Sequence, residues 1–169
     1  MKDVACLLNA MVDEGVIKNY AVFGAVAQMR YTEAVVTIDA DILVVVPDAK
    51  RMDVLSPIYE FCLKRGYQPE GESIRVGAWP VQFIPTFDPL TESAVADAEV
   101  GDMDGEPFRV VKADYLAVIA LGVGRPKDFT RILSLIEAGA TTVDAICRLA
   151  GKHGLAPAWQ TFQERFYGR

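Results

Sequence analysis

The chain is poor in the residues that metal–thiolate sites, disulfide frameworks and catalytic triads require. Its 169 residues include three cysteines and a single histidine. Cys6, Cys62 and Cys147 lie far apart and form no C-x-x-C spacing, which argues against zinc and disulfides and favours buried, reduced thiols. His153 has no cysteine or serine at a meaningful spacing, so we expect it to end a helix rather than to act in catalysis.

Positive charge and long apolar runs are also scarce. The chain has 17 basic and 23 acidic residues, a net charge of −6 and a pI of about 4.8, with no basic cluster, so duplex DNA is not an expected partner. No apolar run reaches membrane-spanning length, and the N-terminus has acids within its apolar pattern and no cleavage site. We therefore expect no membrane association, no signal peptide and a cytoplasmic location.

Hydrophobic residues make up 51% of the chain, and their pattern predicts a mixed α/β region followed by helices. One amphipathic helix is expected over Val4–Val12 with Asp3 as its N-cap, a second from Val54, and a third that begins at Asp88-Pro89. A short helix is expected after Gly24-Ala25. Strands are expected at Tyr20–Phe23, Asp41–Val46, Ser73–Val76, Val81–Pro85 and Phe108–Val111. Four helical stripes follow Lys112, so we predict an α/β core over residues 1–111 and a helical subdomain over 112–169, packed on that core.

The most informative stretch is Phe23–Pro47, FGAVAQMRYTEAVVTIDADILVVVP. Residues i and i+2 of a strand point to the same face, so Asp39 and Asp41 are expected to face one place. Two carboxylates there repel each other unless a cation lies between them, and magnesium prefers carboxylate and phosphate oxygens. This pattern predicts a metal-assisted phosphoryl or nucleotidyl transfer site with Asp39 and Asp41 as metal ligands and catalytic acids.

A glycine between a strand and a helix lets backbone N–H groups approach a phosphate, so Gly24-Ala25 is a candidate phosphate loop. The alternative for the same residues is a turn glycine with two solvated acids at the mouth of a strand. An acid pair alone is weak support for a site. The order strand, Gly-small, short helix, Asp-x-Asp and apolar strand is more specific and favours the nucleotide site.

This order resembles the nucleotidyltransferase superfamily of the polymerase-β type. It is more narrowly similar to small prokaryotic nucleotidyltransferase-fold proteins related to abortive-infection toxins of the AbiEii kind. Leu116–Leu135, LAVIALGVGRPKDFTRILSL, resembles the helical segment of that family with its Arg-x-Lys-Asp core, here Arg125, Lys127 and Asp128. The segment VQFIPTFDPLTESAV is also similar. The resemblance implies an α/β (α+β) nucleotidyltransferase fold, a small mixed sheet with helices on one side, plus a C-terminal helical subdomain.

The resemblance also implies roles for these residues. Lys127 and Asp128 would contact phosphate and position substrate near a cleft whose other wall carries Gly24, Asp39 and Asp41, and Arg125 would clamp phosphate. The alternative is a solvated helix start with Pro126 in its first turn, Asp128 favoured by the helix dipole and Arg125 paired on the surface.

Three positions depart from the family pattern. Where the family has a third carboxylate on a later strand, this chain has Gln82; where related toxins carry a helical lysine, it has Ala120; and where an acid follows the Lys-Asp pair, it has Arg131. In addition, Ala25 replaces the usual second glycine or serine. A site with two carboxylates can still hold magnesium, because water fills the remaining positions.

Two function classes follow. The first is an enzyme that uses Mg²⁺ or Mn²⁺ to transfer a nucleoside monophosphate from a nucleoside triphosphate to an acceptor, with RNA and protein as the acceptor classes of related proteins. The second is a catalytically degenerate nucleotide- or protein-binding module of the same fold, from a toxin–antitoxin system or with a homo-oligomer or antitoxin partner. The departures at Gln82, Ala25, Ala120 and Arg131 favour the second class, and the order of motifs favours the first.

Overall fold

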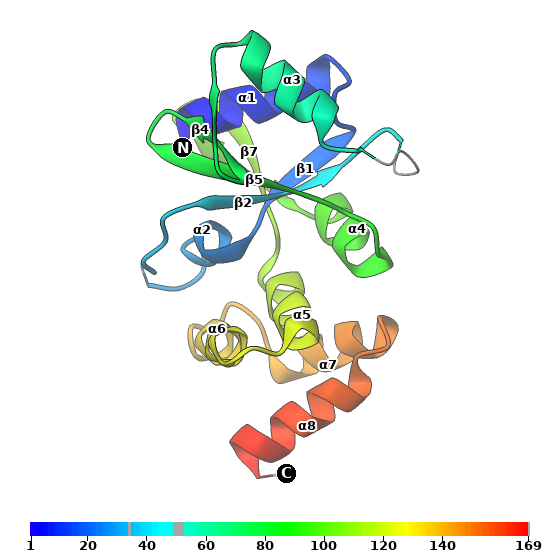
Figure 1. Cartoon of the computed structure of the whole chain (residues 1–169). Helices are drawn as coiled ribbons and strands as arrows, with labels where there is room; N and C mark the ends of the chain where they lie inside the picture. Colours follow the sequence, from blue (N-terminus) through cyan, green and yellow to red (C-terminus); the bar gives the residue numbers. More distant parts are fainter. Residues whose placement is uncertain (34, 49–52, 169) are drawn as a thin grey trace. The chain divides into compact units, whose positions relative to one another are not determined.

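The computed structural model describes residues 1–33, 35–48 and 53–168, which form eight helices and seven strands (Figure 1). Contacts between Cα atoms divide the chain into two compact units. The first unit comprises Met1–Ala27 and Val35–Val111, and the second comprises Gln28–Ala34 and Lys112–Arg169.

The first unit is built on one mixed sheet of seven strands in the order β3-β4-β5-β2-β1-β7-β6. β2 lies in the middle, antiparallel to β1 and parallel to β5. The strands are β1 (Asn19–Val22), β2 (Ala40–Val45), β3 (Gln68–Glu70), β4 (Ser73–Val76), β5 (Trp79–Pro85), β6 (Glu99–Met103) and β7 (Glu106–Val110). The prediction of a mixed sheet with a central, continuously apolar strand is confirmed.

Four helices cover this sheet: α1 (Lys2–Asp13), α2 (Gly24–Gln28), α3 (Ser56–Lys64) and α4 (Pro89–Ala96). Figure 1 shows α1 and α3 on one face of the sheet and α2 and α4 on the opposite face. The expectation of helices on one side is therefore wrong. The apolar run of β2 reflects this arrangement, since Ile42, Leu43 and Val44 are all buried although successive side chains point to opposite faces.

Local sequence signals account for several of these elements. The side chain of Asp88 accepts hydrogen bonds from the backbone N–H groups of Leu90 and Thr91, which confirms the predicted cap of α4. The predicted cap of α1 is wrong, because the helix begins at Lys2 and Asp3 lies inside its first turn. Two edge strands were not expected, β3 with its exposed residues and β6, part of which resembled a polar turn.

The second unit contains α5 (Ala113–Val123), α6 (Pro126–Glu137), α7 (Val143–Lys152) and α8 (Ala156–Tyr167). α5 is its central helix: it contacts the other three helices and is buried along most of its length. The four helical stripes predicted after Lys112 correspond to these helices. No helix in the described part of the chain combines the length and apolar character that crossing a membrane requires.

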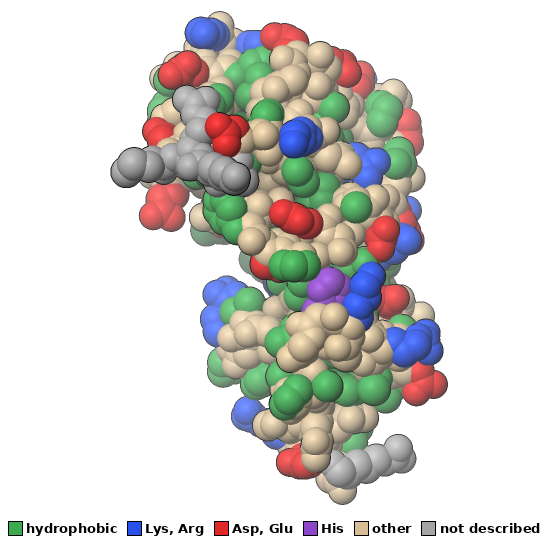
Figure 2. Space-filling model, turned by 90° about the vertical axis from the view of Figure 1, so that its right-hand side faces the viewer, with side chains coloured by type: hydrophobic (Ala, Val, Ile, Leu, Met, Phe, Trp, Pro, Cys, Tyr) green, Lys and Arg blue, Asp and Glu red, His purple; other side chains and the backbone are tan. Residues whose placement is uncertain are grey.

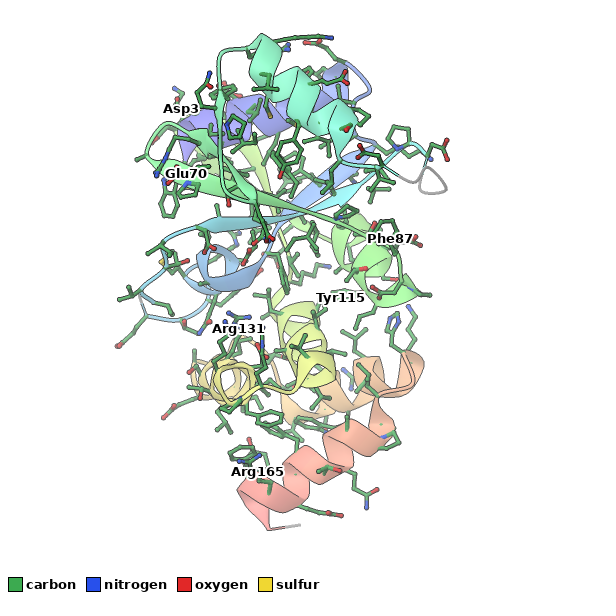
Figure 3. All side chains as sticks on the ribbon, viewed as in Figure 1. Asp3, Glu70, Phe87, Tyr115, Arg131 and Arg165 are labelled. Atoms are coloured by element: carbon green, nitrogen blue, oxygen red, sulfur yellow. The ribbon has the colours of Figure 1, made fainter. Side chains whose placement is uncertain are left out.

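An aromatic cluster forms part of the core of the second unit. The rings of Trp159 and Phe162 stack with centroids 5.1 Å apart, and Phe129 lies 5.8 Å from both Phe162 and Phe166. Arg165 lies beside this cluster (Figure 3), its guanidinium carbon 5.3 Å from the rings of Phe129 and Phe166. Burial of a large aromatic side chain contributes about 2–3 kcal/mol, so this cluster stabilises the packing of α8 against α6.

The surface carries both signs of charge. On the face drawn in Figure 2, acidic and basic side chains are interspersed with apolar ones rather than gathered into one patch of a single sign.

Candidate functional site

A close contact between a glycine and a carboxylate lies at the start of α2. Gly24 follows β1 with a φ of +63°. A Cβ atom built on Gly24 would lie 2.2 Å from Oδ2 of Asp41, 3.1 Å from its Cγ and 3.2 Å from its Cβ. Both the positive φ and the lack of space therefore demand glycine here. The backbone supports the same contact, since the N–H of Phe23 donates to the carbonyl oxygen of Asp41 over 2.8 Å.

Asp41 is fixed by the sheet as well as by Gly24. It is the second residue of β2, and the parallel register of β2 and β5 pairs it with Gln82. Side chains of paired residues in neighbouring strands project from the same face of a sheet. This register places Gln82 beside Asp41, and the prediction that Gln82 occupies the position of a further carboxylate stays a prediction. Its amide oxygen can bind a cation but carries no formal charge.

Asp39 lies just outside the strand that contains Asp41. β2 begins at Ala40, so Asp39 precedes the strand, and its side chain is half-buried. The hydroxyl of Thr37 lies 3.0 Å from the carbonyl oxygen of Asp39 and 3.2 Å from its Oδ1. The prediction that both carboxylates face one place assumed a strand through both residues, and it stays a prediction because only Asp41 lies within the strand.

The remaining candidate of the phosphate loop is Ala25. It is the second residue of α2, a helix of five residues, and it is half-buried. The sequence predicted that the helix would begin after the Gly24-Ala25 pair, whereas the structure begins it at Gly24. Such a short helix has a weak dipole, so a phosphate here would depend mainly on individual backbone N–H groups.

The oxygens that the candidate residues carry are of the kind that a hard divalent cation prefers. Asp39 and Asp41 offer carboxylate oxygens, and Gln82 beside Asp41 offers an amide oxygen. No group of three His, Cys, Asp or Glu side chains suited to a metal occurs within residues 1–33, 35–48 and 53–168. Magnesium normally keeps several waters and takes further oxygens from substrate phosphates, so two carboxylates are a sufficient protein contribution.

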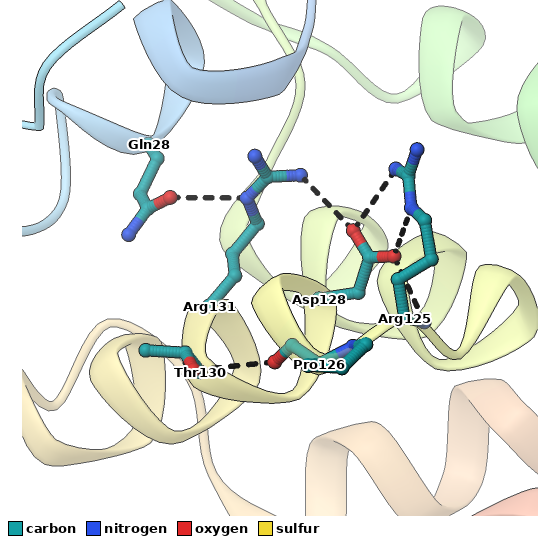
Figure 4. A network of polar contacts seen from close by, with 6 residues as sticks. All are labelled: Gln28, Arg125, Pro126, Asp128, Thr130 and Arg131. Atoms are coloured by element: carbon teal, nitrogen blue, oxygen red, sulfur yellow. Dashed lines mark hydrogen bonds and ion pairs between the residues drawn. The ribbon is translucent and has the colours of Figure 1, made fainter.

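Two candidate residues of the second unit, Arg125 and Asp128, form a network with Arg131 at the start of α6 (Figure 4). Arg125 is the N-cap of α6, and its backbone N–H donates to Oδ2 of Asp128 over 3.1 Å. Its Nε donates to the same oxygen over 2.7 Å and its Nη2 to Oδ1 over 3.2 Å. This is a two-pronged guanidinium–carboxylate pair. Arg131 approaches Asp128 from one turn further on, with 4.0 Å between Nη1 and Oδ1.

Asp128 is 1% exposed, so the expectation of a solvated acid at a helix start is wrong. Burial by itself raises the pKa of Asp128, but the hydrogen bonds from Arg125 and the charges of Arg125 and Arg131 outweigh it and leave the pKa below its usual value. Asp128 is therefore a charged acid neutralised by two arginines, and its role within the second unit is to cap α6.

Two of the positions that depart from the family pattern, Arg131 and Ala120, lie in the second unit. Arg131 donates from Nε to the amide oxygen of Gln28 over 3.0 Å (Figure 4), so this buried glutamine is satisfied by the arginine that stands in place of an acid. Ala120 is 2% exposed within α5. Lys127 is exposed in the first turn of α6.

Two residues with polar contacts at these sites, Thr37 and Gln28, were not predicted. Thr37 lies two positions before Asp39, and a threonine hydroxyl can reach acceptors that close along the chain, so that spacing could have indicated its contact. No sequence signal pairs Gln28 with Arg131, because 103 positions separate them.

No protein-family model matches this sequence, and neither does any curated protein. Solved structures do match. An antigenic nucleotidyltransferase-like protein from Paracoccidioides brasiliensis is similar over 94% of this chain and 93% of its own, with 14% identity and a TM-score of 0.56. The antibiotic-resistance factor ANT(2'')-Ia matches in its solution structure with 14% identity and a TM-score of 0.48, over 99% and 94% of the two chains. Its crystal structure in complex with adenylyl-2''-tobramycin matches with 15% identity and a TM-score of 0.47, over 96% and 97%.

Identity this low carries information on the fold alone, and the first of these structures matches well enough to show it. The mixed sheet and the surrounding helices agree with the expected fold class. The chain therefore has a nucleotidyltransferase-like fold.

Proposed function

We propose that the protein is a metal-dependent nucleotidyltransferase that moves a nucleoside monophosphate from a nucleoside triphosphate to an acceptor. The observation that carries this proposal is the contact between Gly24 and Asp41, a glycine of positive φ on which an acid of the central strand packs with no room for a Cβ. The same contact lies where the strand, glycine, short helix and Asp-x-Asp follow one another along the chain, and that combination supports the proposal.

In the proposed reaction an acceptor oxygen bonds to the α-phosphorus as the bond from that phosphorus to the β-phosphate bridging oxygen breaks. Pyrophosphate leaves, and the acceptor proton passes to water. Asp39 and Asp41 would hold Mg²⁺ or Mn²⁺, which supplies positive charge to the phosphate oxygens when bound. The backbone N–H groups of Gly24 and Ala25 would bind the triphosphate.

The proposal keeps the roles that the resemblance implies for the second unit. Lys127, exposed and in the first turn of α6, would offset phosphate charge. Arg125 would clamp phosphate with the part of its guanidinium that remains accessible, since 56% of its side chain is exposed. Asp128 would act as a positioning acid that holds Arg125.

A second candidate function is a degenerate binding module of the same fold. The register between Asp41 and Gln82 favours it, because the neighbour of the acid is a neutral amide and the site has one negative charge less than three carboxylates would give. We further propose an AbiEii-like relationship and a toxin–antitoxin origin for this protein. Its acceptor would be an RNA or a protein, and its partner would be an antitoxin or a second copy of the chain. A small antitoxin reading frame beside the gene would support that origin.

Calorimetry with ATP and Mg²⁺, followed by a labelled-nucleotide transfer assay, tests the proposal. We expect the wild-type protein to bind ATP and to transfer label, and Asp39→Ala and Asp41→Ala to lose both. Asp144→Ala is the matched control, since Asp144 is an exposed acid of α7. Binding without transfer would favour the degenerate module. Absence of both would remove the enzyme, and binding unaffected by the alanines at 39 and 41 would remove the acid pair from the site.

A further inference from the structure

We infer that Thr37 is a positioning residue that orients the Asp39 carboxylate toward the cation; this inference rests on the proposed function. The hydroxyl oxygen of Thr37 lies 3.0 Å from the carbonyl oxygen of Asp39 and 3.2 Å from its Oδ1. The single hydroxyl proton is thus shared between a backbone and a carboxylate acceptor of the same residue. A donor on Oδ1 restricts rotation of the carboxylate about its side-chain bonds.

The apolar neighbours of Thr37 contribute little packing to this segment. The side chains on either side of Thr37 point outward, with Val36 96% exposed and Ile38 82% exposed. Thr37 and Asp39 are both half-buried, and Ile38 and Asp39 lie in a bend directly before β2. Because Val36 and Ile38 bury almost nothing, the contacts of the Thr37 hydroxyl help to tie Asp39 to its own segment.

The two acids are therefore positioned by different means. Asp41 lies within β2, paired to β5 through Gln82 and packed against Gly24. Asp39 lies outside that ladder, and the hydroxyl of Thr37 contacts both its backbone and its side chain. Loss of that hydroxyl should loosen Asp39 alone and leave the Gly24–Asp41 contact as it is.

Groups that hydrogen-bond a metal-ligating side chain typically change metal affinity by about 10–100-fold when removed. A hydroxyl donor is neutral, so it orients the carboxylate without cancelling its charge, and its removal should weaken binding at the lower end of that range. Thr37→Val keeps the shape of the side chain and removes the donor, whereas Thr37→Ser keeps the donor and removes a methyl group.

The experiment is a Mn²⁺ titration of the full chain, in which electron paramagnetic resonance measures free Mn²⁺. We expect Thr37→Val and Thr37→Ala to weaken Mn²⁺ binding by about 10-fold and Thr37→Ser to stay within about 2-fold of wild type. The control is Thr161→Val, because the Thr161 hydroxyl donates to a carbonyl oxygen in α8. It should bind Mn²⁺ as wild type does, and thermal unfolding establishes that each variant is folded.

The outcomes separate this inference from the proposed function. If the wild-type protein binds no Mn²⁺, the cation site of the proposed function fails and the role of Thr37 fails with it. If the wild type binds Mn²⁺, Asp41→Ala abolishes binding and Thr37→Val binds normally, the inference about Thr37 alone is overturned. Equal losses in Thr37→Val and Thr37→Ser would overturn it as well, since the hydroxyl would then not be the determinant.

Discussion

Replacement of Gly24 by alanine should displace the Asp41 carboxylate. The added methyl group would lie 2.2 Å from Oδ2 and 3.1 Å from Cγ of Asp41, distances that require the side chain of Asp41 to rotate away. The backbone resists too, because a φ of +63° costs a residue with a Cβ about 1–2 kcal/mol. We therefore expect two effects, a lower free energy of unfolding and weaker cation binding.

Gly15→Ala separates these effects. Gly15 has a φ of +71°, close to that of Gly24, but a Cβ on it would meet nothing within 4 Å. It should lower the free energy of unfolding by about 1 kcal/mol through its backbone alone. Gly24→Ala carries the same backbone cost plus that of moving the half-buried Asp41 side chain, for a total of about 1–3 kcal/mol.

Urea unfolding measures the stability difference, and a Mn²⁺ titration measures the functional one. Gly24→Ala should weaken Mn²⁺ binding by at least about 10-fold, while Gly15→Ala leaves it unchanged. In an Asp41→Ala background the nearest clash disappears, so Gly24→Ala should cost little more than Gly15→Ala. The reasoning is refuted if the two glycine variants have equal stability and both bind Mn²⁺ as wild type does.

Two further predictions concern charge. Gln82→Glu places a carboxylate beside Asp41. It should tighten Mn²⁺ binding by about 10-fold, equivalent to about 1.4 kcal/mol, and lower the stability of the metal-free protein through repulsion between the two carboxylates. An unchanged Mn²⁺ titration would contradict the placement of Gln82. Asp128→Asn keeps an oxygen for the cap of α6 but removes the buried charge, so it should cost about 1–3 kcal/mol at pH 7. Because the pKa of Asp128 lies below its usual 3.8 in the folded protein, its stabilising contribution is present above pH 5 and is lost as the pH falls below about 3.8. In urea unfolding between pH 7 and pH 2, the free energy of unfolding should therefore depend less on pH for Asp128→Asn than for wild type. Parallel curves would contradict the assignment of an ion pair to Asp128. The control is Asp144→Asn, because Asp144 is an exposed acid.

The parts of the fold that sequence reasoning predicted are those set by local chemistry. Asp88-Pro89 begins a helix because an acid accepts the first free N–H groups and proline lacks one. The apolar run after Asp41 forms the central strand because branched side chains pack on both faces of a covered sheet. Edge strands such as β3 escaped prediction because their exposed residues carry no hydrophobic alternation.

The candidate site likewise has features that neighbours along the chain determine and features that depend on tertiary contacts. The sequence by itself determined that an Asp-x-Asp pair follows a strand, a glycine and a short helix, since this is a property of neighbours along the chain. Only the tertiary structure decided that Gly24 touches Asp41, that Gln82 lies beside that acid, and that Arg131 joins Asp128 to Gln28. These contacts depend on strand register and on helix packing between distant segments, and a hydrophobic pattern specifies which face is buried but not which polar groups meet.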